Sequence, residues 1–233
     1  MQHRRADFKI YQNVFDNFTE RTLFKLISQK HIDGLVGPVK IGKESNVFLA
    51  KKGNDKIIVK IYRIENAEFK RMFEYIRKDL RYQNMTRNNR KIIFSWTQRE
   101  YRNLFLAREA GVSVPMPIAF VNNILVLEYI GDSEPAPRLK DAIPKDSKKF
   151  FKEVLDNMKK LHKAGLVHAD LSEFNILNYH EKPIFIDFSQ STLLKSPNSE
   201  ELVARDVRNM ARFFNKIGVK TSEEDIRKYI TKK

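Results

Sequence analysis

Two nearby stretches, LVHADLSEFNIL (166–177) and PIFIDF (183–188), carry the strongest signal in the chain. Both place polar residues beside short apolar segments that are typical of strands. Asp170 and Asn175 lie five positions apart in the first stretch, in the pattern D-x-x-x-x-N, and Asp187 follows the apolar run of the second. The spacing puts Asp170 and Asn175 on one loop, so a single backbone segment would position both.

Phosphoryl transfer from ATP explains why these residue types belong together. Lys60, on a predicted strand within IIVKIY (57–62), can neutralise part of the phosphate charge. Asn175 and Asp187 offer the oxygen ligands that magnesium prefers. A separate carboxylate, that of Asp170, can orient or deprotonate the attacking hydroxyl.

The simpler alternative is that Asp170, Ser172 and Asn175 only cap turns, which is common for these residue types. The order of the motifs along the chain favours chemistry: a strand lysine, the D-x-x-x-x-N loop, and a second aspartate after an apolar strand follow one another as in kinases. His168 could be read as a base or metal ligand, but we interpret it as a buried residue that hydrogen-bonds the loop.

Glu100, on the predicted helix TQREYRNLFLA (97–107), is the expected ion-pair partner of Lys60. The alternative is an ordinary surface glutamate. The segment GPVKIGK (37–43) nearly spells a Walker A loop, but Glu44 stands where that motif needs Ser or Thr, and a strand-like segment follows instead of a helix. A phosphate-covering loop between two strands is therefore the better interpretation.

Hydrophobic periodicity and turn residues predict the order of elements along the chain. Helices and strands alternate in the first half, and helices dominate the second. The expected elements are a helix over 16–30, three strands between 36 and 62, a mostly helical stretch over 66–110 with a polar gap at 83–91, a strand over 124–130, a helix over 146–163, two short strands around the loop of 166–188, a helix over 199–217, and a last helix that begins at a capping box of Thr221 and Glu224.

Composition narrows the function classes. The 233 residues contain no cysteine, which excludes disulfides, thiolate metal sites and cysteine nucleophiles. No apolar run is long enough to cross a bilayer and the N-terminus has no signal-like apolar segment, so the expected location is the cytoplasm. The formal net charge of +15 favours polyanionic partners, such as nucleic acid, nucleotide or a ribonucleoprotein surface, although a solvated basic surface would give the same count.

The motifs taken together resemble those of the RIO atypical serine/threonine kinases. The segments that carry the resemblance are GKESN (42–46), VKIYRIENAEFKRM (59–72), QREYRNLFLAREAGVSVPMPIA (98–119), VLEYIG (126–131), PAPRLKD (135–141), LVHADLSEFNIL (166–177) and FIDFSQS (185–191). KIYRIENAEFKRM and the PMPIA run are most similar to the Rio-one subfamily. The loop KIGKESN (40–46) departs from the Ser-Thr-Gly-Lys-Glu-Ala-like run usual in that subfamily.

The resemblance implies an α+β, two-lobed protein-kinase-like fold, with a small antiparallel-sheet N-lobe and a mainly helical, truncated C-lobe without an activation segment. Asp-Phe-Ser at 187–189 in place of Asp-Phe-Gly, and the lack of an Ala-Pro-Glu motif, agree with this. We expect a single kinase domain over 1–233, made of an N-terminal helical extension (1–35), an N-lobe (36–127), a hinge (128–131) and a C-lobe (132–233).

The resemblance also implies roles for individual residues. Lys60 would contact the ATP phosphates and pair with Glu100, Asp170 would be the catalytic aspartate, and Asn175 and Asp187 would hold Mg²⁺, or Mn²⁺ in its place. Asp187 would also be able to accept the phosphoryl group as an aspartyl-phosphate. The remaining nucleotide contacts would come from the phosphate loop and from backbone groups of the hinge: Ile41, Lys43, Glu44, Val47, Glu128 and Ile130.

Three functions follow from these observations. The first is an ATP-dependent serine/threonine kinase or ATPase of RIO type, for which the resemblance implies a role in maturation of the small ribosomal subunit. The second is a ribonucleoprotein-binding factor that uses ATP as a conformational latch, which is favoured by the charge and by a basic stretch at 63–102. Its partner would be rRNA or the pre-small-subunit particle. The third is a small-molecule kinase, which would share the D-x-x-x-x-N loop.

Overall fold

The computed structural model describes residues 15–64, 68–82 and 87–232. The chain forms two compact units, and each consists of segments that alternate along the sequence. The first contains Met1–Ile76, Asn84–Tyr101 and Pro117–Tyr129, and the second contains Arg77–Gln83, Arg102–Met116 and Ile130–Lys233. The lobe and hinge boundaries expected from the sequence stay a prediction. None of the described helices is long and apolar enough to cross a membrane.

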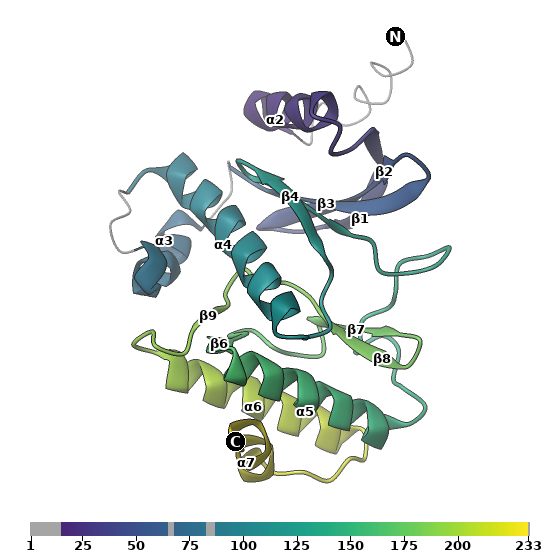
Figure 1. Cartoon of the computed structure of the whole chain (residues 1–233), viewed down its shortest axis with the longest axis vertical. Coiled ribbons are helices and arrows are strands. Elements are labelled where there is room, and N and C mark those ends of the chain that lie inside the picture. Colours follow the sequence, from purple (N-terminus) through teal and green to yellow (C-terminus); the bar gives the residue numbers. More distant parts are fainter. Residues whose placement is uncertain (1–14, 65–67, 83–86, 233) are drawn as a thin grey trace. The chain divides into compact units, whose positions relative to one another are not determined.

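A five-stranded antiparallel sheet forms the centre of the first unit, with strand order β1-β2-β3-β5-β4 (Figure 1). Its strands are β1 (Gly34–Ile41), β2 (Ser45–Lys52), β3 (Asp55–Tyr62), β4 (Pro117–Val121) and β5 (Ile124–Glu128). Four of them were predicted. β4 was missed because prolines that closely follow a helix are typical of a loop. A proline at the start of an edge strand is compatible with pairing, since its missing N–H costs no ladder bond there.

Helix α2 (Asn17–Ser28) packs beside this sheet and near β5, as predicted for residues 16–30 (Figure 1). Asp16 caps it by accepting a hydrogen bond from the Thr19 N–H at 2.8 Å. Leu23 and Leu26 are fully buried because they repeat at helical spacing toward the sheet. They join a core made largely of inward-facing strand residues, among them Phe48, Val59, Ile61, Ile124 and Val126.

Helices α3 (Phe69–Lys78) and α4 (Asn89–Glu109), with a short 3-10 turn at Leu80–Tyr82, make up the predicted helical stretch. The gap expected at 83–91 is shorter than predicted, because α4 already begins at Asn89; residues 83–86 lie outside the described part of the chain. Residues of α4 up to Tyr101 belong to the first unit and those from Arg102 onward belong to the second.

Three helices build most of the second unit: α5 (Ser147–Lys163), α6 (Ser199–Lys216) and α7 (Glu223–Thr231). Figure 1 shows α5 and α6 side by side, and the rings of Phe151 and Phe214 lie 4.5 Å apart between them. Two small antiparallel pairs complete the unit. They are β6 (Leu166–Val167) with β9 (Thr192–Leu193), and the hairpin of β7 (Ile176–Tyr179) with β8 (Lys182–Phe185).

The start of α7 corrects one prediction. The capping box is formed by Ser222 and Asp225, one residue later than the predicted Thr221 and Glu224. The Ser222 hydroxyl accepts from the Asp225 N–H at 3.0 Å, and the Asp225 carboxylate accepts from the Ser222 N–H at 3.2 Å. Thr221 is tied instead to the end of α6, because both its N–H and its carbonyl bond the Asn215 side chain. Because Thr221 bonds Asn215 at the end of the preceding helix, the cap of α7 falls on Ser222, one position later.

Candidate active site

Lys60 lies buried on β3, in the first unit, and is paired with Glu100 on α4. The Lys60 Nζ is 2.8 Å from Glu100 Oε1, and the two residues are only 6% and 1% exposed. The Tyr62 hydroxyl donates to the other carboxylate oxygen of Glu100. Both oxygens of Glu100 therefore have partners. A buried charge is tolerated only when it is paired and hydrogen-bonded in this way. The ion pair expected from the sequence is present.

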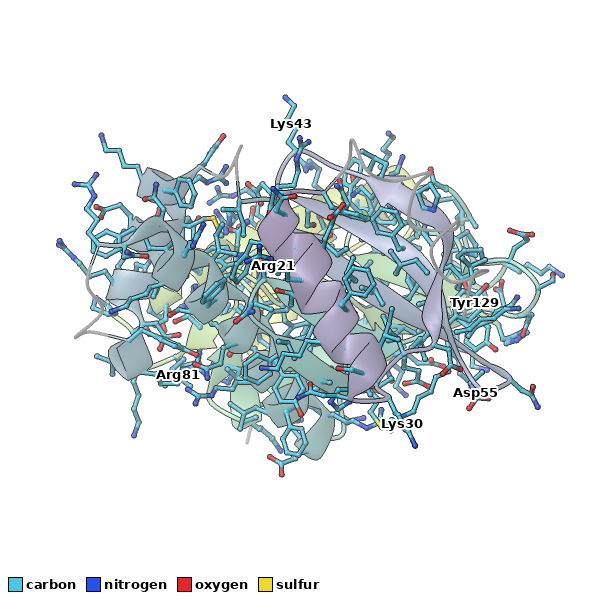
Figure 2. All side chains as sticks on the ribbon, turned by 90° about the horizontal axis from the view of Figure 1, so that it is seen from above. Arg21, Lys30, Lys43, Asp55, Arg81 and Tyr129 are labelled. Atoms are coloured by element: carbon cyan, nitrogen blue, oxygen red, sulfur yellow. The ribbon has the colours of Figure 1, made fainter. Side chains whose placement is uncertain are left out.

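The loop between β1 and β2 lies next to the end of β3, because the Arg63 N–H donates to the Glu44 carbonyl at 3.0 Å. Its Gly42 N–H donates to Asn46 Oδ1 at 3.3 Å, and a side chain at Gly42 would meet the Ser45 carbonyl oxygen at 2.7 Å. Lys43 is exposed, and Figure 2 shows its side chain directed away from the protein. Val47, on β2, pairs in register with Lys60 on β3, so this predicted nucleotide contact lies next to the lysine.

The remaining nucleotide candidates are distributed over both units. Ile41 ends β1 with 57% of its surface exposed, and the neighbouring Glu44 is also exposed. Glu128 ends β5 opposite Ile57 of β3, in the first unit. Ile130 belongs to the second unit, where its carbonyl accepts a hydrogen bond from the Ala136 N–H at 2.9 Å.

In the second unit, Asp170 and Asn175 contact each other directly. Asn175 Nδ2 donates to the Asp170 carbonyl at 2.8 Å and to Asp170 Oδ2 at 3.1 Å. Both residues are half-buried. The amide nitrogen makes these bonds, so the Asn175 oxygen is the atom that would face a cation. The two predicted residues therefore act as one preformed group.

Asp187 lies beside this group because the β7–β8 ladder continues by one bond. The Ile186 N–H donates to the Asn175 carbonyl at 2.9 Å, and Asp187 follows with a left-handed φ of 65°. The Ser189 hydroxyl donates to Asp187 Oδ1 at 2.8 Å. A non-glycine residue rarely adopts this backbone conformation, and such strain is concentrated at functional sites.

The oxygen set fits magnesium. Mg²⁺ is commonly held by one or two protein oxygens together with substrate phosphates, instead of by a complete protein cage. Asn175 and Asp187 would provide two such oxygens. Accordingly, the residues that the structure describes contain no cluster of three or more His, Cys, Asp or Glu suited to a metal ion.

His168 is fully buried and supports the loop. Its Nε2 lies 3.0 Å from the Ile186 carbonyl, and its ring packs edge-on against Phe188 with 4.6 Å between centroids. These contacts agree with the supporting role expected from the sequence. They also connect the Asp170 loop to the segment that carries Asp187.

Asp206, on α6, is a site residue that sequence reasoning missed. Its two carboxylate oxygens accept from the Ala169 N–H at 2.8 Å and the Leu171 N–H at 2.9 Å, so it holds the backbone on both sides of Asp170. Ala169 has a left-handed φ of 69°, which this clamp helps to maintain. The sequence did contain a signal for Asp206. It falls on the apolar stripe of its helix, between Val203 and Val207, where a charged residue is unusual unless it has a buried hydrogen-bond partner.

Burial dominates the electrostatics of Asp206. The residue is 3% exposed and borders a cavity of about 20 Å³, room for about one water molecule, whose other lining residues are mostly apolar. This desolvation raises the pKa of Asp206 to about 7, even though the N–H groups of Leu171 and Ala169 and the nearby Arg205 act to lower it.

A strand lysine paired with a helix glutamate, and a D-x-x-x-x-N loop next to an aspartate after a strand, define the class of protein-kinase-like phosphotransferases. Comparison with known proteins specifies the class further. The family model described as "RIO domain" matches residues 46–229. The chain belongs to the RIO family and is a RIO-type kinase.

Individual proteins that resemble the chain are also RIO kinases. The RIO-type serine/threonine-protein kinase Rio1 of Haloferax volcanii is 38% identical over 99% of this chain and 81% of its own length. The Rio1 kinase of Methanocaldococcus jannaschii is 42% identical over 97% of this chain and 79% of its own length. Among solved structures, the Rio2 kinase–ADP/Mg²⁺–phosphoaspartate complex of Chaetomium thermophilum matches with a TM-score of 0.70 at 24% identity, over 91% of this chain and 66% of that chain.

Proposed function

We propose that this RIO-type kinase binds ATP with Mg²⁺ and transfers its γ-phosphoryl group through Asp170, Asn175, Asp187 and Lys60. The observation that carries the proposal is the contact of Asn175 with Asp170, extended by the ladder bond that brings Asp187 alongside. Mg²⁺ held by Asn175 and Asp187 would neutralise charge on the phosphate oxygens. Mn²⁺ could replace it in the same oxygen set.

The ATP itself would be held by residues of the loop and strands described above. Lys60, oriented by Glu100, would neutralise the phosphate tail. The loop residues Lys43 and Glu44 would lie over the phosphates, with Ile41 and Val47 against the base. Backbone groups of Glu128 and Ile130 would hydrogen-bond the adenine.

Asp187 is also the proposed phosphoryl acceptor. One of its carboxylate oxygens would attack the γ-phosphorus as the bond to the β-phosphate oxygen breaks, which releases ADP and leaves an acyl phosphate. Water would then hydrolyse this acyl phosphate, or a hydroxyl oriented by Asp170 would take the phosphoryl group. The solved Rio2 complex is described as a phosphoaspartate, which supports the same chemistry here.

Labelling with ATP that carries ³²P on its γ-phosphate tests the proposal. We expect protein-bound label that hydroxylamine removes, because an acyl phosphate is labile to it and a phosphoserine is not. Asp187→Asn should abolish this label, and Asp170→Asn should slow turnover by about 100-fold or more. Parental activity in both variants, with each folded, would overturn the proposed roles.

For the cellular role, we propose cytoplasmic maturation of the small ribosomal subunit. The Rio1 names of its relatives and the net charge of +15 support a partnership with rRNA or a pre-small-subunit particle. The charge also favours the second candidate, a ribonucleoprotein-binding factor in which ATP acts as a latch. The relatives named above are protein kinases, so a small-molecule substrate is the weaker alternative.

A further inference from the structure

Asn103, near the C-terminal end of α4, is completely buried and bonds the segment that follows Asp187. Its amide nitrogen donates to the Phe188 carbonyl at 3.1 Å and to the Ser191 carbonyl at 2.7 Å. A side-chain amide has two N–H donors, so both are used on this one turn. All of these residues belong to the second unit.

Arg81 determines which way the Asn103 amide faces. Its guanidinium Nη2 donates to Asn103 Oδ1 at 2.8 Å, so the amide oxygen points to Arg81 and the nitrogen points to the turn. Arg81 is itself fixed by the fully buried Asp79, through bonds of 2.9 Å from Nε and 2.6 Å from Nη2. A two-point arginine–carboxylate contact restricts orientation as well as distance. Arg81 is labelled in Figure 2.

The same turn is held from its other side by His168. The Ser191 hydroxyl donates to the His168 carbonyl at 2.9 Å, and His168 Nε2 bonds the Ile186 carbonyl. The left-handed Asp187 therefore lies within a short segment that is anchored just before it, at Ile186, and after it, at Phe188 and Ser191. Such strained backbone persists only where its surroundings enforce it.

We propose that Asn103 is a positioning residue for the Asp187 carboxylate, and that Arg81 acts through it by orienting the amide. The inference rests on the proposed function, in which Asp187 holds Mg²⁺. Asn103 bonds two backbone carbonyls and the Arg81 guanidinium in this arrangement, so it would act on the metal requirement without touching a reactant. Its loss would raise the Mg²⁺ concentration needed for activity and leave metal-free nucleotide binding unchanged.

Asn103→Asp tests the inference most directly, because it keeps the shape of the side chain and changes only its hydrogen-bonding groups. It replaces two N–H donors by a carboxylate oxygen that faces two carbonyl oxygens, which leaves buried acceptors unpaired and repelling. We expect the Mg²⁺ concentration for half-maximal ATP turnover to rise at least tenfold. Arg81→Gln should shift it in the same direction by a smaller factor. ADP affinity measured in EDTA should stay within twofold of the parent.

Asn178→Asp is the matched control. Asn178 is also a buried asparagine of the second unit that donates to a carbonyl, that of Ala142, at 3.2 Å. It should lower stability without changing the Mg²⁺ requirement. A general loss of stability would instead change the Mg²⁺ response of all three variants together, and that result would overturn the inference.

Asp187→Asn separates this inference from the proposed function. If the ADP affinity of Asp187→Asn responds to Mg²⁺ as that of the parent does, the proposed metal role itself fails. If that Mg²⁺ effect on ADP affinity is lost in Asp187→Asn, while Asn103→Asp and Arg81→Gln both keep the Mg²⁺ concentration for half-maximal turnover within twofold of the parent, the positioning role alone is wrong. Should Asn103→Asp fail to fold, Arg81→Lys decides. It should shift the Mg²⁺ requirement in the same direction, because it removes the guanidinium that orients the amide while it keeps a cation beside the buried Asp79.

Discussion

At the scale of single residues, the site depends on charges that are buried and paired. Lys60 and Glu100 are separated by 40 positions in the sequence, yet they form a contact of 2.8 Å in a nearly solvent-free position. Removing one member of such a pair is costly because the other remains as an uncompensated charge. The pair therefore matters for stability as well as for the proposed nucleotide binding.

Lys60→Met should abolish detectable ATP turnover and lower the free energy of unfolding by about 3–5 kcal/mol. Lys60→Arg should keep most of the stability but lose activity, because a planar guanidinium does not replace an ammonium at a fixed site. Turnover assays and urea unfolding measure the two effects. Lys56→Met, at an exposed position of the same strand, is the control and should change neither by much. Full activity in Lys60→Met would contradict the proposed role.

Asp206 gives a prediction about pH. Its pKa of about 7 in the folded protein lies above the value of about 4 for an unfolded chain. Between these values the folded state binds more protons, so the free energy of unfolding should fall as pH rises from 4 to 7, by up to about 1.4 kcal/mol per pH unit from this group. Urea unfolding at several pH values should show that Asp206→Asn removes this component of the slope. An unchanged slope in the variant would show that Asp206 titrates normally.

At the scale of elements, the β1–β2 loop combines exposed charges with a sterically restricted glycine. Gly42 cannot accept a side chain without moving the Ser45 carbonyl, whereas Gly34, at the start of the same β1 strand, has no heavy atom within 4 Å of such a side chain. Alanine substitutions at these two glycines therefore distinguish a change in loop shape, at Gly42, from a change in backbone propensity alone, at Gly34.

Gly42→Ala should displace the loop and raise the KM for ATP several-fold with a smaller effect on kcat, since the proposed contacts of the loop are to the bound nucleotide. Gly34→Ala should leave both constants close to the parent. Steady-state kinetics at saturating Mg²⁺ measures the difference. Equal KM values in the two variants would remove the loop from the proposed nucleotide site.

At the scale of the whole molecule, the dominant property is the net charge of +15, with 11 Lys or Arg against 5 Asp or Glu between Arg63 and Arg102. Contacts between basic side chains and phosphates release counterions, so their strength depends steeply on salt. The charge therefore predicts binding to a polyanion. The slope of log affinity against log salt concentration measures how many phosphate contacts the protein makes.

Binding to small-subunit rRNA should weaken by a factor of ten or more between about 50 and 200 mM salt. Changing the exposed Arg87, Arg90 and Lys91 to Gln should reduce the slope of log K against log salt by up to about 3. The same change at the exposed Lys145, Lys148 and Lys149 of the second unit serves as the charge-matched control. Fluorescence anisotropy measures both. Identical slopes would show that the basic stretch makes no phosphate contact.

Local sequence was sufficient for most of the elements and for the site residues that lie close together along the chain. Asp170 and Asn175 share one loop, so their spacing alone implied a common site. Most helices and strands were predicted because hydrophobic periodicity reflects which side of an element is buried. β4 was missed because it becomes a strand by pairing with β5 at the edge of the sheet, and its proline-containing sequence does not reveal that pairing.

Tertiary structure alone decided the supports of the site. Asp206 bonds Ala169 across 37 positions and Asn103 bonds Ser191 across 88, and the sequence pattern does not reveal which backbone group either side chain bonds. Buried polar groups must find partners wherever the fold brings a donor or acceptor near, so their roles depend on three-dimensional packing. The sequence by itself therefore determined the kind of protein and the residues proposed to react, while the packing of α4 and α6 residues against two loops decided how those residues are held.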